Sequence, residues 1–498
     1  MNIPTEDVDP TQIKSTLIQY IAGLRLDDEE RRRDAIHLIG VMFDHPSLEV
    51  ATALQQALPE ILDDLLPYLH HNDDGVRGTV ASALSIMAAC IVDDQTLMSP
   101  DDIPKVLDSL VPCADDPAPW TRLNAIIALR SIATSAPAVA VVASCGKLPE
   151  LLGTLIACLR DENAAVKHGT APGLRYIVRM TCPEAGAAVA AAAPNLLDGL
   201  VTGLTDAVWW VRGDSVRTLG AMGSSPCADV GVAMVDMLPS VLRGLLTCLR
   251  DDRMEIRASA AESLGAIAGA SQAAVSEACI ASLVGVLDGL RACLADESWE
   301  VKSAAAASLS KIACNPHTGV SEPVADALPS IIPALQACLQ DRDLSMRSSA
   351  VRAFGKFAQS PHPAVGHALA EELPAVMDVL QGCLHGGATQ VKSSTATMFG
   401  ELATSPYAAV AVVVTGKLPS VIDDLVATLE SRTPWVMQTA ATALRTMAGS
   451  SHRPVTEVLA SRAEQLMDQL RGCREEAPDT LQPVYQLAMD AIGALPRE

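Results

Sequence analysis

The sequence predicts an all-α fold, a right-handed α-solenoid of about eleven helical repeats of 45 residues. Three observations predict it. The segment VVASCGKLPELLGTLIACLRD at residues 141–161 returns in similar form as VVVTGKLPSVIDDLVATLES at residues 412–431. A Leu-Pro pair recurs at multiples of 45 residues. The chain is 49% hydrophobic but only 3% aromatic, so Ala, Leu and Val must carry the burial, which suits closely packed helices better than sheets.

The Leu-Pro pair marks the register of each repeat. Ile-Pro, Ala-Pro and Leu-Val replace it in three repeats, and the register extends back to Ile13 and forward to Ala463 with no insertion or deletion. The first residues of the marker are Leu58, Ile103, Leu148, Ala193, Leu238, Leu283, Leu328, Leu373 and Leu418.

Each repeat reads as a first helix, a turn, a second helix and a short third helix. In LPSVLRGLLTCLRDD, which starts at Leu238, the apolar residues follow helical spacing, and an Asp then ends the helix. In MEIRASAAESLGAIAG, which starts at Met254, they again form one stripe. Proline costs little at the second position of the first helix, because its missing N–H would have no partner there. One repeat cannot bury its apolar face alone, so neighbours must stack.

The marker, an Asp thirteen residues after it, and a Val-Arg or Val-Lys pair five residues further on resemble the HEAT repeat. The third segment and the G-x-L-P restart are similar to armadillo repeats. The resemblance covers about residues 13–495 and implies a scaffold, transport receptor or regulatory subunit. It also implies a structural ladder of Asp and basic side chains between neighbouring repeats, which we assign to Asp161 with Lys167, Asp206 with Arg212, Asp251 with Arg257, Asp296 with Lys302, and Asp341 with Arg347.

The pattern predicts two parts of the chain. Residues 1–12 are expected to form a flexible N-terminal segment, and residues 13–498 a single continuous solenoid. The pattern decays at both ends. Toward the C-terminus Gly386 and Ser431 replace the Asp and Met437 replaces the basic residue, and the first repeat has Arg31-Arg32 in place of the apolar-basic pair. Terminal repeats need a polar outer face, so we interpret the decayed repeats as caps.

The charge and the N-terminus bear on location and partners. The formal net charge is −23, which argues against binding the phosphate backbone of nucleic acids over a broad surface. It is compatible with basic partner proteins, or simply with solubility. The acidic start MNIPTEDVDPTQ has no signal-peptide pattern, and no uninterrupted apolar run has the length of a membrane span, so we expect a cytoplasmic protein.

No pattern of residues indicates catalysis, a metal or a cofactor, so we expect a protein that is not an enzyme. Adjacent repeats lie roughly 8–10 Å apart, too far for a disulfide or a shared zinc, which makes the cysteine column a set of small buried apolar residues. It comprises Cys113, Cys158, Cys248, Cys293, Cys338, Cys383 and Cys473, all ten residues after the marker. None of the ten histidines is followed by Glu, as the iron-binding His-Glu pairs of HEAT-type hydroxylases would require.

The five tryptophans are the most selective feature. All lie sixteen or seventeen residues after the marker, at the start of a second helix, but in only four repeats: Trp120, Trp209, Trp210, Trp299 and Trp435. They could pack over their own turns, or they could form a partner-binding edge, since tryptophan is a frequent hot spot. Nearby acidic residues such as Asp116, Asp206 and Asp296 would then favour a basic partner.

Two functions are compatible with these observations. The first is a non-catalytic scaffold or adaptor that holds protein partners along an elongated surface. The second is a transport-receptor or chaperone-like binder of basic protein cargo. Gly169, Pro172 and Gly173 lie inside one second helix, where the proline predicts a kink that sets curvature or opens a pocket beside Tyr176.

Overall fold

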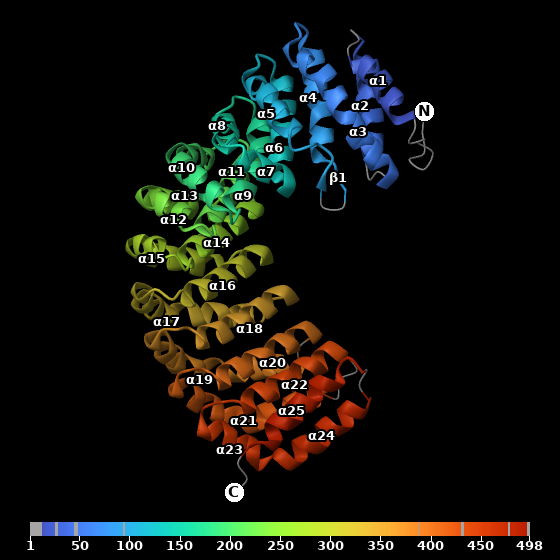
Figure 1. Cartoon of the computed structure of the whole chain (residues 1–498). Helices are drawn as coiled ribbons and strands as arrows, with labels where there is room; N and C mark the ends of the chain where they lie inside the picture. Colours follow the sequence, from blue (N-terminus) through green and yellow to red (C-terminus); the bar gives the residue numbers. More distant parts are fainter. Residues whose placement is uncertain are drawn as a thin grey trace. The chain divides into compact units, whose positions relative to one another are not determined.

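The computed structural model describes residues 12–24, 28–43, 48–92, 95–386, 388–429, 433–476 and 479–495. Of the predicted N-terminal segment, residues 1–11 lie outside the described residues. The chain divides into two compact units, Met1–Met237 and Leu238–Glu498. Each unit is a stack of helical repeats, which confirms the all-α solenoid (Figure 1). That residues 13–498 form one continuous array stays a prediction.

Unit 1 contains the elements up to α12 and the short 3₁₀ helix η5. Their bounds are α1 Ile13–Leu24, α2 Glu29–Phe43, α3 Leu48–Leu65, η3 Leu66–His70, α4 Asp74–Ala89, β1 Ile91–Val92, β2 Gln95–Thr96, α5 Asp102–Leu110, η4 Pro112–Asp115, α6 Pro119–Thr134, α7 Ala136–Ser144, α8 Leu148–Cys158, α9 Ala164–Val178, α10 Pro183–Gly203, α11 Trp209–Gly223, α12 Ala228–Met234 and η5 Val235–Met237. The second helices α2, α4, α6, α9 and α11 pack one on the next, while α3 packs between α1 and α5, and α8 against α10.

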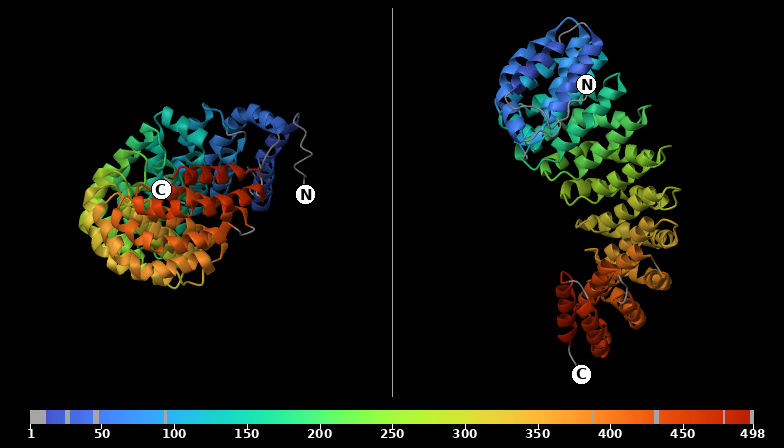
Figure 2. Two further views of the ribbon diagram at one scale, coloured as in Figure 1. Left: turned by 90° about the horizontal axis from the view of Figure 1, so that it is seen from below. Right: turned by 90° about the vertical axis from the view of Figure 1, so that its right-hand side faces the viewer.

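Unit 2 repeats this arrangement in a more regular form. Its elements are α13 Leu238–Cys248, α14 Met254–Ala268, α15 Ala273–Cys293, α16 Trp299–Ala313, η6 Thr318–Val320, α17 Ser321–Cys338, α18 Leu344–Ala358, α19 Pro363–Gly386, α20 Thr389–Ala403, α21 Ala408–Leu429, α22 Pro434–Ala448, α23 Arg453–Ser461, α24 Ala463–Glu476 and α25 Gln482–Gly493. The second helices α14, α16, α18, α20, α22 and α25 form one layer, and α13, α15, α17, α19 and α21 the other (Figure 2).

The apolar core lies between these two layers. The marker leucines are fully buried: Leu58, Leu148, Leu238, Leu328, Leu373 and Leu418 all have relative exposures of 2% or less. Burying a leucine side chain contributes roughly 1.5–3 kcal/mol. The recurrence of this one position along the array therefore supplies a large part of the force that stacks the repeats.

Two local expectations were wrong. The Leu-Pro pair begins the first helix in α8 and α13, but in α3, α10, α17, α19 and α21 the marker proline lies inside a longer helix. There the Ala-rich third segment is itself a good helix former and continues into the next first helix. In the second repeat, the third segment forms a small antiparallel β-ladder of β1 and β2 in place of a helix, in keeping with the β-branched residues Ile91 and Val92.

A set of side-chain hydrogen bonds, mostly from serines, joins neighbouring repeats at the ends of five second helices, α9, α14, α16, α18 and α20. The Ser405 hydroxyl donates to the carbonyl oxygen of Ala358 at 2.7 Å, 47 residues earlier, and Ser360 donates to Ala313 at 2.6 Å. Ser225 and Ser450 make the equivalent bonds, and Asn315 donates its amide N–H to Ala268 at 2.9 Å. Each bond gives an otherwise unpaired helix-end carbonyl a donor in the next repeat.

Three helices of the described chain are long and apolar enough to cross a membrane, judged by length and composition only: Pro183–Gly203, Ala228–Cys248 and Ala273–Cys293. The bent pair Pro119–Thr134 and Ala136–Ser144 passes the same test as one span. The sequence expectation concerned uninterrupted apolar runs, and scattered polar residues interrupt the apolar runs of these helices. In α10 and α15 the buried residues, among them Val189, Leu196, Val275 and Leu283, lie in the solenoid core.

Candidate functional site

The predicted Asp and basic columns form ion pairs between neighbouring repeats. In unit 2 the Arg257 guanidinium donates to both carboxylate oxygens of Asp296, from Nε at 2.8 Å and Nη2 at 2.9 Å. The same arrangement joins Arg77 to Asp116 and Arg122 to Asp161, while Lys167 binds Asp206 and Lys302 binds Asp341 through a single N–H. Each basic side chain thus reaches the Asp of the next repeat, 39 residues later.

The residues of one repeat are joined differently. Arg257 donates from Nη1 to the backbone oxygen of Asp251 at 3.0 Å, and Arg212 to that of Asp206 at 3.1 Å. The Asp carboxylate also accepts the backbone N–H two residues later, as Asp251 does from Arg253. The ladder therefore joins a turn and the starts of two second helices. Within one repeat, the basic side chain contacts the backbone oxygen of the Asp, and not its carboxylate.

The ladder ends where its acids are lost. The position 39 residues after Arg347 is Gly386, so Arg347 donates instead to the carbonyl oxygen of Leu339 at 3.1 Å. The next position in the column is Ser431, which lies outside the described residues. Arg347 and Lys392 thus keep the basic half of the ladder without its acidic half.

The pKa values of four ladder carboxyls, those of Asp116, Asp206, Asp296 and Asp341, lie below their ordinary value. Burial raises the pKa of Asp296. The hydrogen bonds from Arg257 and from the Ser298 N–H lower it by more than burial raises it, so the pKa lies below its ordinary value of 3.8. The same balance of burial against the basic partner lowers the pKa of Asp116, Asp206 and Asp341. The ionised acids consequently contribute to folding.

We expect the protein to lose stability in acid for this reason. Because these carboxyls have a lower pKa when folded, their contribution is full above the ordinary Asp pKa and is lost as the pH falls through the folded value. Urea unfolding at a series of pH values between about 5 and about 2 should show the free energy of unfolding falling. Asp296→Asn should flatten this slope, and an unchanged slope would contradict the assignment.

The cysteine column occupies buried positions. Cys113, Cys158, Cys248, Cys293, Cys338 and Cys383 are buried and Cys473 is partly buried. Burial raises the pKa of Cys158 to about 12 and that of Cys293 to about 11, which leaves these thiols protonated and unreactive at neutral pH. The Cys338 thiol donates to the Leu294 carbonyl oxygen at 3.3 Å, so it also makes a weak contact to the preceding repeat. Among the described residues no three His, Cys, Asp or Glu side chains come together as metal ligands.

Every tryptophan lies in the first turn of a second helix, in α6, α11, α16 or α22. Four indoles are exposed: Trp120 by 57%, Trp435 by 46%, and Trp210 and Trp299 by 39% each. Trp209 is partly buried and meets Trp210 edge to face, with ring centroids 5.8 Å apart. In each unit, therefore, the tryptophan column places exposed apolar rings at the starts of second helices.

The acids beside these rings are mostly engaged. Asp116, Asp206 and Asp296 are ladder residues, each bound to a cation of the preceding repeat. Glu300 accepts a hydrogen bond from Ser298. The argument from sequence that these acids would attract a basic partner therefore loses most of its support at Trp299.

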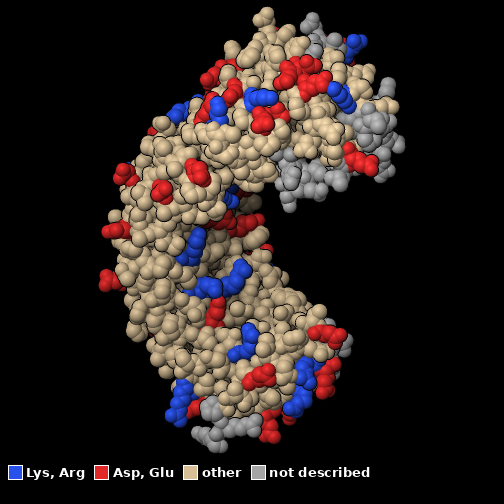
Figure 3. Space-filling view, viewed as in Figure 1, with Lys and Arg blue, Asp and Glu red and all other residues tan. Residues whose placement is uncertain are grey.

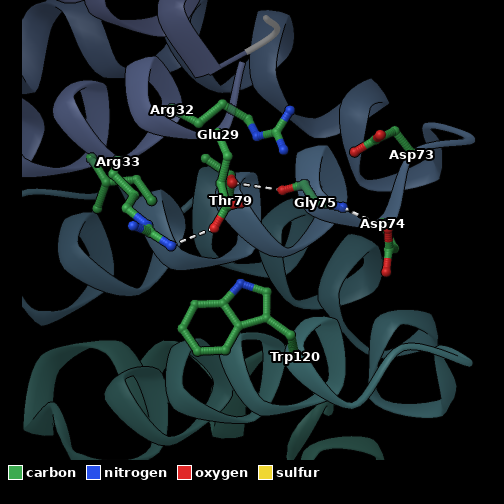
Figure 4. Close-up of a pocket in the computed structure, with 9 residues that line it drawn as sticks. Glu29, Arg32, Arg33, Asp73, Asp74, Gly75, Thr79 and Trp120 are labelled. Carbon is green, nitrogen blue, oxygen red and sulfur yellow. Dashed lines mark hydrogen bonds and ion pairs between the residues drawn. The ribbon is translucent and has the colours of Figure 1, made fainter. Parts of the chain in front are cut away.

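At Trp120 the indole borders a pocket of about 460 Å³ (Figure 4). Residues of α2 and of the start of α4 form its other walls: Glu29, Arg32, Arg33, Ile36, Asp73, Asp74, Gly75 and Thr79. Gly78 lets the ring lie against α4, since a Cβ there would stand 2.5 Å from the Trp120 Cδ1. Glu29 is paired with Arg33, Asp73 caps α4 through the Val76 N–H, and Asp74 accepts the Gly75 N–H.

Nothing in the sequence pattern indicated this pocket directly. Its walls come from residues 29–36, 73–79 and 120, which only the stacking of three repeats brings together. One signal was present, the small residue Gly78 in a second helix whose equivalent position in the next repeat is Leu123.

The fold and the ladder are those of HEAT-type helical repeats. A family model described as GCN1-like, C-terminal HEAT repeats matches residues 212–357. No curated protein sequence matches the chain.

Solved structures with the same fold include an engineered protein and yeast importin-β. The engineered protein is 22% identical with a TM-score of 0.57, over 87% of this chain and 99% of that one. Yeast importin-β (Kap95p) is 16% identical with a TM-score of 0.61, over 97% of this chain and 58% of that one. Kap95 in complex with Nup1 is 14% identical with a TM-score of 0.58, over 96% and 67%. The chain thus spans little more than half the length of Kap95p, and these likenesses show the fold.

Proposed function

We propose that this protein is a non-catalytic scaffold that holds protein partners along its helical repeats, with the exposed tryptophans as anchor points. The observation that carries the proposal is the outward position of four indoles in a chain with only five. A ring that merely packs over its own turn would be covered by it. Exposed tryptophans, such as Trp120 at the edge of a pocket, are typical of binding hot spots.

At the Trp120 pocket the chemistry favours a lysine or arginine side chain of the partner. An indole face attracts a cation, and three carboxylates, those of Glu29, Asp73 and Asp74, line the same pocket. The arginines Arg32 and Arg33 also line it, and Arg32 lies on the side of Asp73. The guest must therefore reach Asp74 at the start of α4, which Figure 4 shows apart from both arginines. A basic partner is proposed for this pocket only.

The alternative is a transport-receptor or chaperone-like binder of basic cargo. Its support is the likeness to Kap95p, which has been solved in complex with Nup1 and with RanGDP. Ionic strength separates the two. Cargo held by the overall charge of −23 should dissociate as salt rises, while a complex anchored on indoles should weaken much less.

We expect Trp120→Ala and Trp299→Ala each to weaken the complex with the main partner by about 2 kcal/mol, roughly thirtyfold in Kd. The partner is first recovered by crosslinking and mass spectrometry, and its affinity is then measured by calorimetry. Because the rings are exposed, the melting temperature should hardly change. Val284→Ala is the control, since Val284 is 62% exposed on α15 and lies in the other layer. Normal binding together with early melting would show that the indoles serve packing alone.

A further inference from the structure

In the stretch of unit 2 from α15 to α22, the two helix layers carry opposite charge. In α16, α18, α20 and α22, seven basic residues stand against two acidic ones: Lys302, Lys311, Arg347, Arg352, Lys356, Lys392 and Arg445 against Glu300 and Glu401. In α15, α17, α19 and α21, nine acidic residues stand against two basic ones: Glu277, Asp288, Glu322, Asp326, Glu371, Glu372, Asp378, Asp423 and Asp424 against Arg291 and Lys417. A chain with a net charge of −23 therefore has a basic stretch in its second-helix layer, from α16 to α22. The helices on either side of it, α14 and α25, carry more acidic than basic residues.

Most of these cations have no acidic partner within the described part of the chain. Lys302 is bound by Asp341, and Lys356 by Glu401 at 2.6 Å. Lys311, Arg352 and Arg445 are exposed and make no ion pair with any described carboxylate. Arg347 and Lys392 belong to the ladder at the point where its acids are replaced by Gly386 and Ser431. The Lys311 side chain is exposed, but its ammonium group is partly shielded from water and has no described carboxylate beside it. This partial loss of hydration lowers its pKa.

Short side chains surround these cations, so the long basic side chains rise above their neighbours. Positions equivalent to Arg352 in the neighbouring repeats hold Ala307, Thr397 and Thr442, so short side chains lie beside the long basic ones. Neighbouring helices are roughly 8–10 Å apart, a distance that an extended chain covers in about three residues. A segment that crosses the helices can therefore place a carboxylate near a cation on each helix. Figure 3 shows Lys and Arg over α16, α18 and α20, and Asp and Glu along the edge of α15 and α17.

We propose that the second-helix surface of unit 2 binds an extended acidic segment of a partner protein. On each helix, one cation binds one carboxylate of the segment. The hydroxyls of Thr397 and Thr442, which donate within their own helices, accept N–H groups of the segment's backbone. A polyphosphate backbone fits less well, because its charges are more closely spaced than the cations and the remainder of the chain repels it. This surface is distinct from the Trp120 pocket, and it takes a partner of the opposite charge.

The test is the affinity of the full chain for a fluorescein-labelled peptide of repeated Glu-Gly-Leu-Asp units, measured by polarisation. We expect the wild type to bind it with salt-dependent affinity and the double variant Lys311→Glu with Arg352→Glu to bind it roughly tenfold or more weakly. Both residues are exposed, so the fold should survive, and the melting curve of the variant checks this.

The control is the double variant Arg243→Glu with Arg250→Glu, which makes the same charge change in the first-helix layer of unit 2. These arginines line a pocket of about 640 Å³ formed by α13 and α15. The control should bind the peptide as the wild type does. Equal losses in both variants, or loss in the control alone, would overturn the proposal. Tighter binding of oligo(dT) of equal charge than of the peptide, lost in the Lys311 and Arg352 variant, would assign the surface to nucleic acid instead. All tryptophans are intact in these variants, so failure here leaves the scaffold proposal standing.

Discussion

Asp296→Ala should lower the free energy of unfolding of the protein by about 3 kcal/mol or more. The carboxylate is 13% exposed and its partner Arg257 is 11% exposed, so the substitution leaves a guanidinium enclosed without its counter-charge. It also removes the acceptor of the Ser298 N–H at the start of α16. Urea denaturation followed by circular dichroism in the far ultraviolet would measure the loss.

Glu297→Ala is the matched control. Glu297 is the next residue, also approaches Arg257, at 3.6 Å, and is 91% exposed. Exposed pairs are worth little, so its removal should change the free energy of unfolding by less than about 0.5 kcal/mol. Equal effects of the two substitutions would show that the ladder contributes only general charge, and that the enclosed pairing has no special weight.

Gly265→Ala should destabilise the protein by about 3 kcal/mol, although alanine is the better helix former. Gly265 lies in α14 where α16 approaches it closely. An added Cβ would stand 2.7 Å from the Cα of Ser308, which is backbone and cannot rotate away. The helices would have to separate, and the bond from the Ser308 hydroxyl to the Ala261 carbonyl, now 2.8 Å, would lengthen.

Gly382→Ala is the matched control, because we expect it to stabilise the protein where Gly265→Ala destabilises it. Gly382 lies in α19 and would place a Cβ in open space. Helix propensity alone then predicts stabilisation of up to about 1 kcal/mol. Thermal melts of both variants against the wild type test the pair. If both substitutions stabilise, α14 and α16 are not as close as the structure has them.

Much of the fold could be predicted from sequence because one packing problem recurs every 45 residues. The buried column that contains Leu148 and Leu238 is the same solution repeated, so its signal accumulates along the chain. The direction of the ladder could not be read in this way. Asp161 lies close in sequence to Lys167 and 39 residues after Arg122, and only the stacked geometry pairs its carboxylate with Arg122.

The exact starts of the first helices could not be predicted, because the marker proline occurs both in the first turn of a helix and inside a longer helix. Proline at position 374 is compatible both with starting a helix and with lying inside α19, since the preceding Ala-rich turn supplies the extra helical residues. The serine bonds were also unforeseen. The sequence gives no sign that the Ser360 hydroxyl, just before Pro361, reaches a carbonyl 47 residues earlier.

For the candidate site, the tryptophan column was foreseen and its surroundings were not. Sequence neighbours of Trp299 such as Asp296 suggested an acidic environment, but that carboxylate is held by Arg257, far away in sequence. Conversely, the acids that border Trp120 come partly from α2, about 90 residues or two repeats earlier. Proximity in sequence is a poor guide to charge in a stack, because each surface is assembled from successive repeats.

The bonds between repeats have a consequence for how such a chain can change its length in evolution. They join partners 39, 46 and 47 positions apart, as in Arg257 with Asp296, Ser348 with Ser394, and Ser360 with Ala313. If residues 258–302 were deleted, the carboxylate 39 positions beyond Arg257 would be that of Asp341, and the ladder would close again. Loss of a single residue would instead turn every following side chain of its helix by about 100° and misalign all three sets of partners. Recombination between copies can therefore shorten or lengthen this protein in whole repeats, while smaller insertions and deletions break the bonds between repeats.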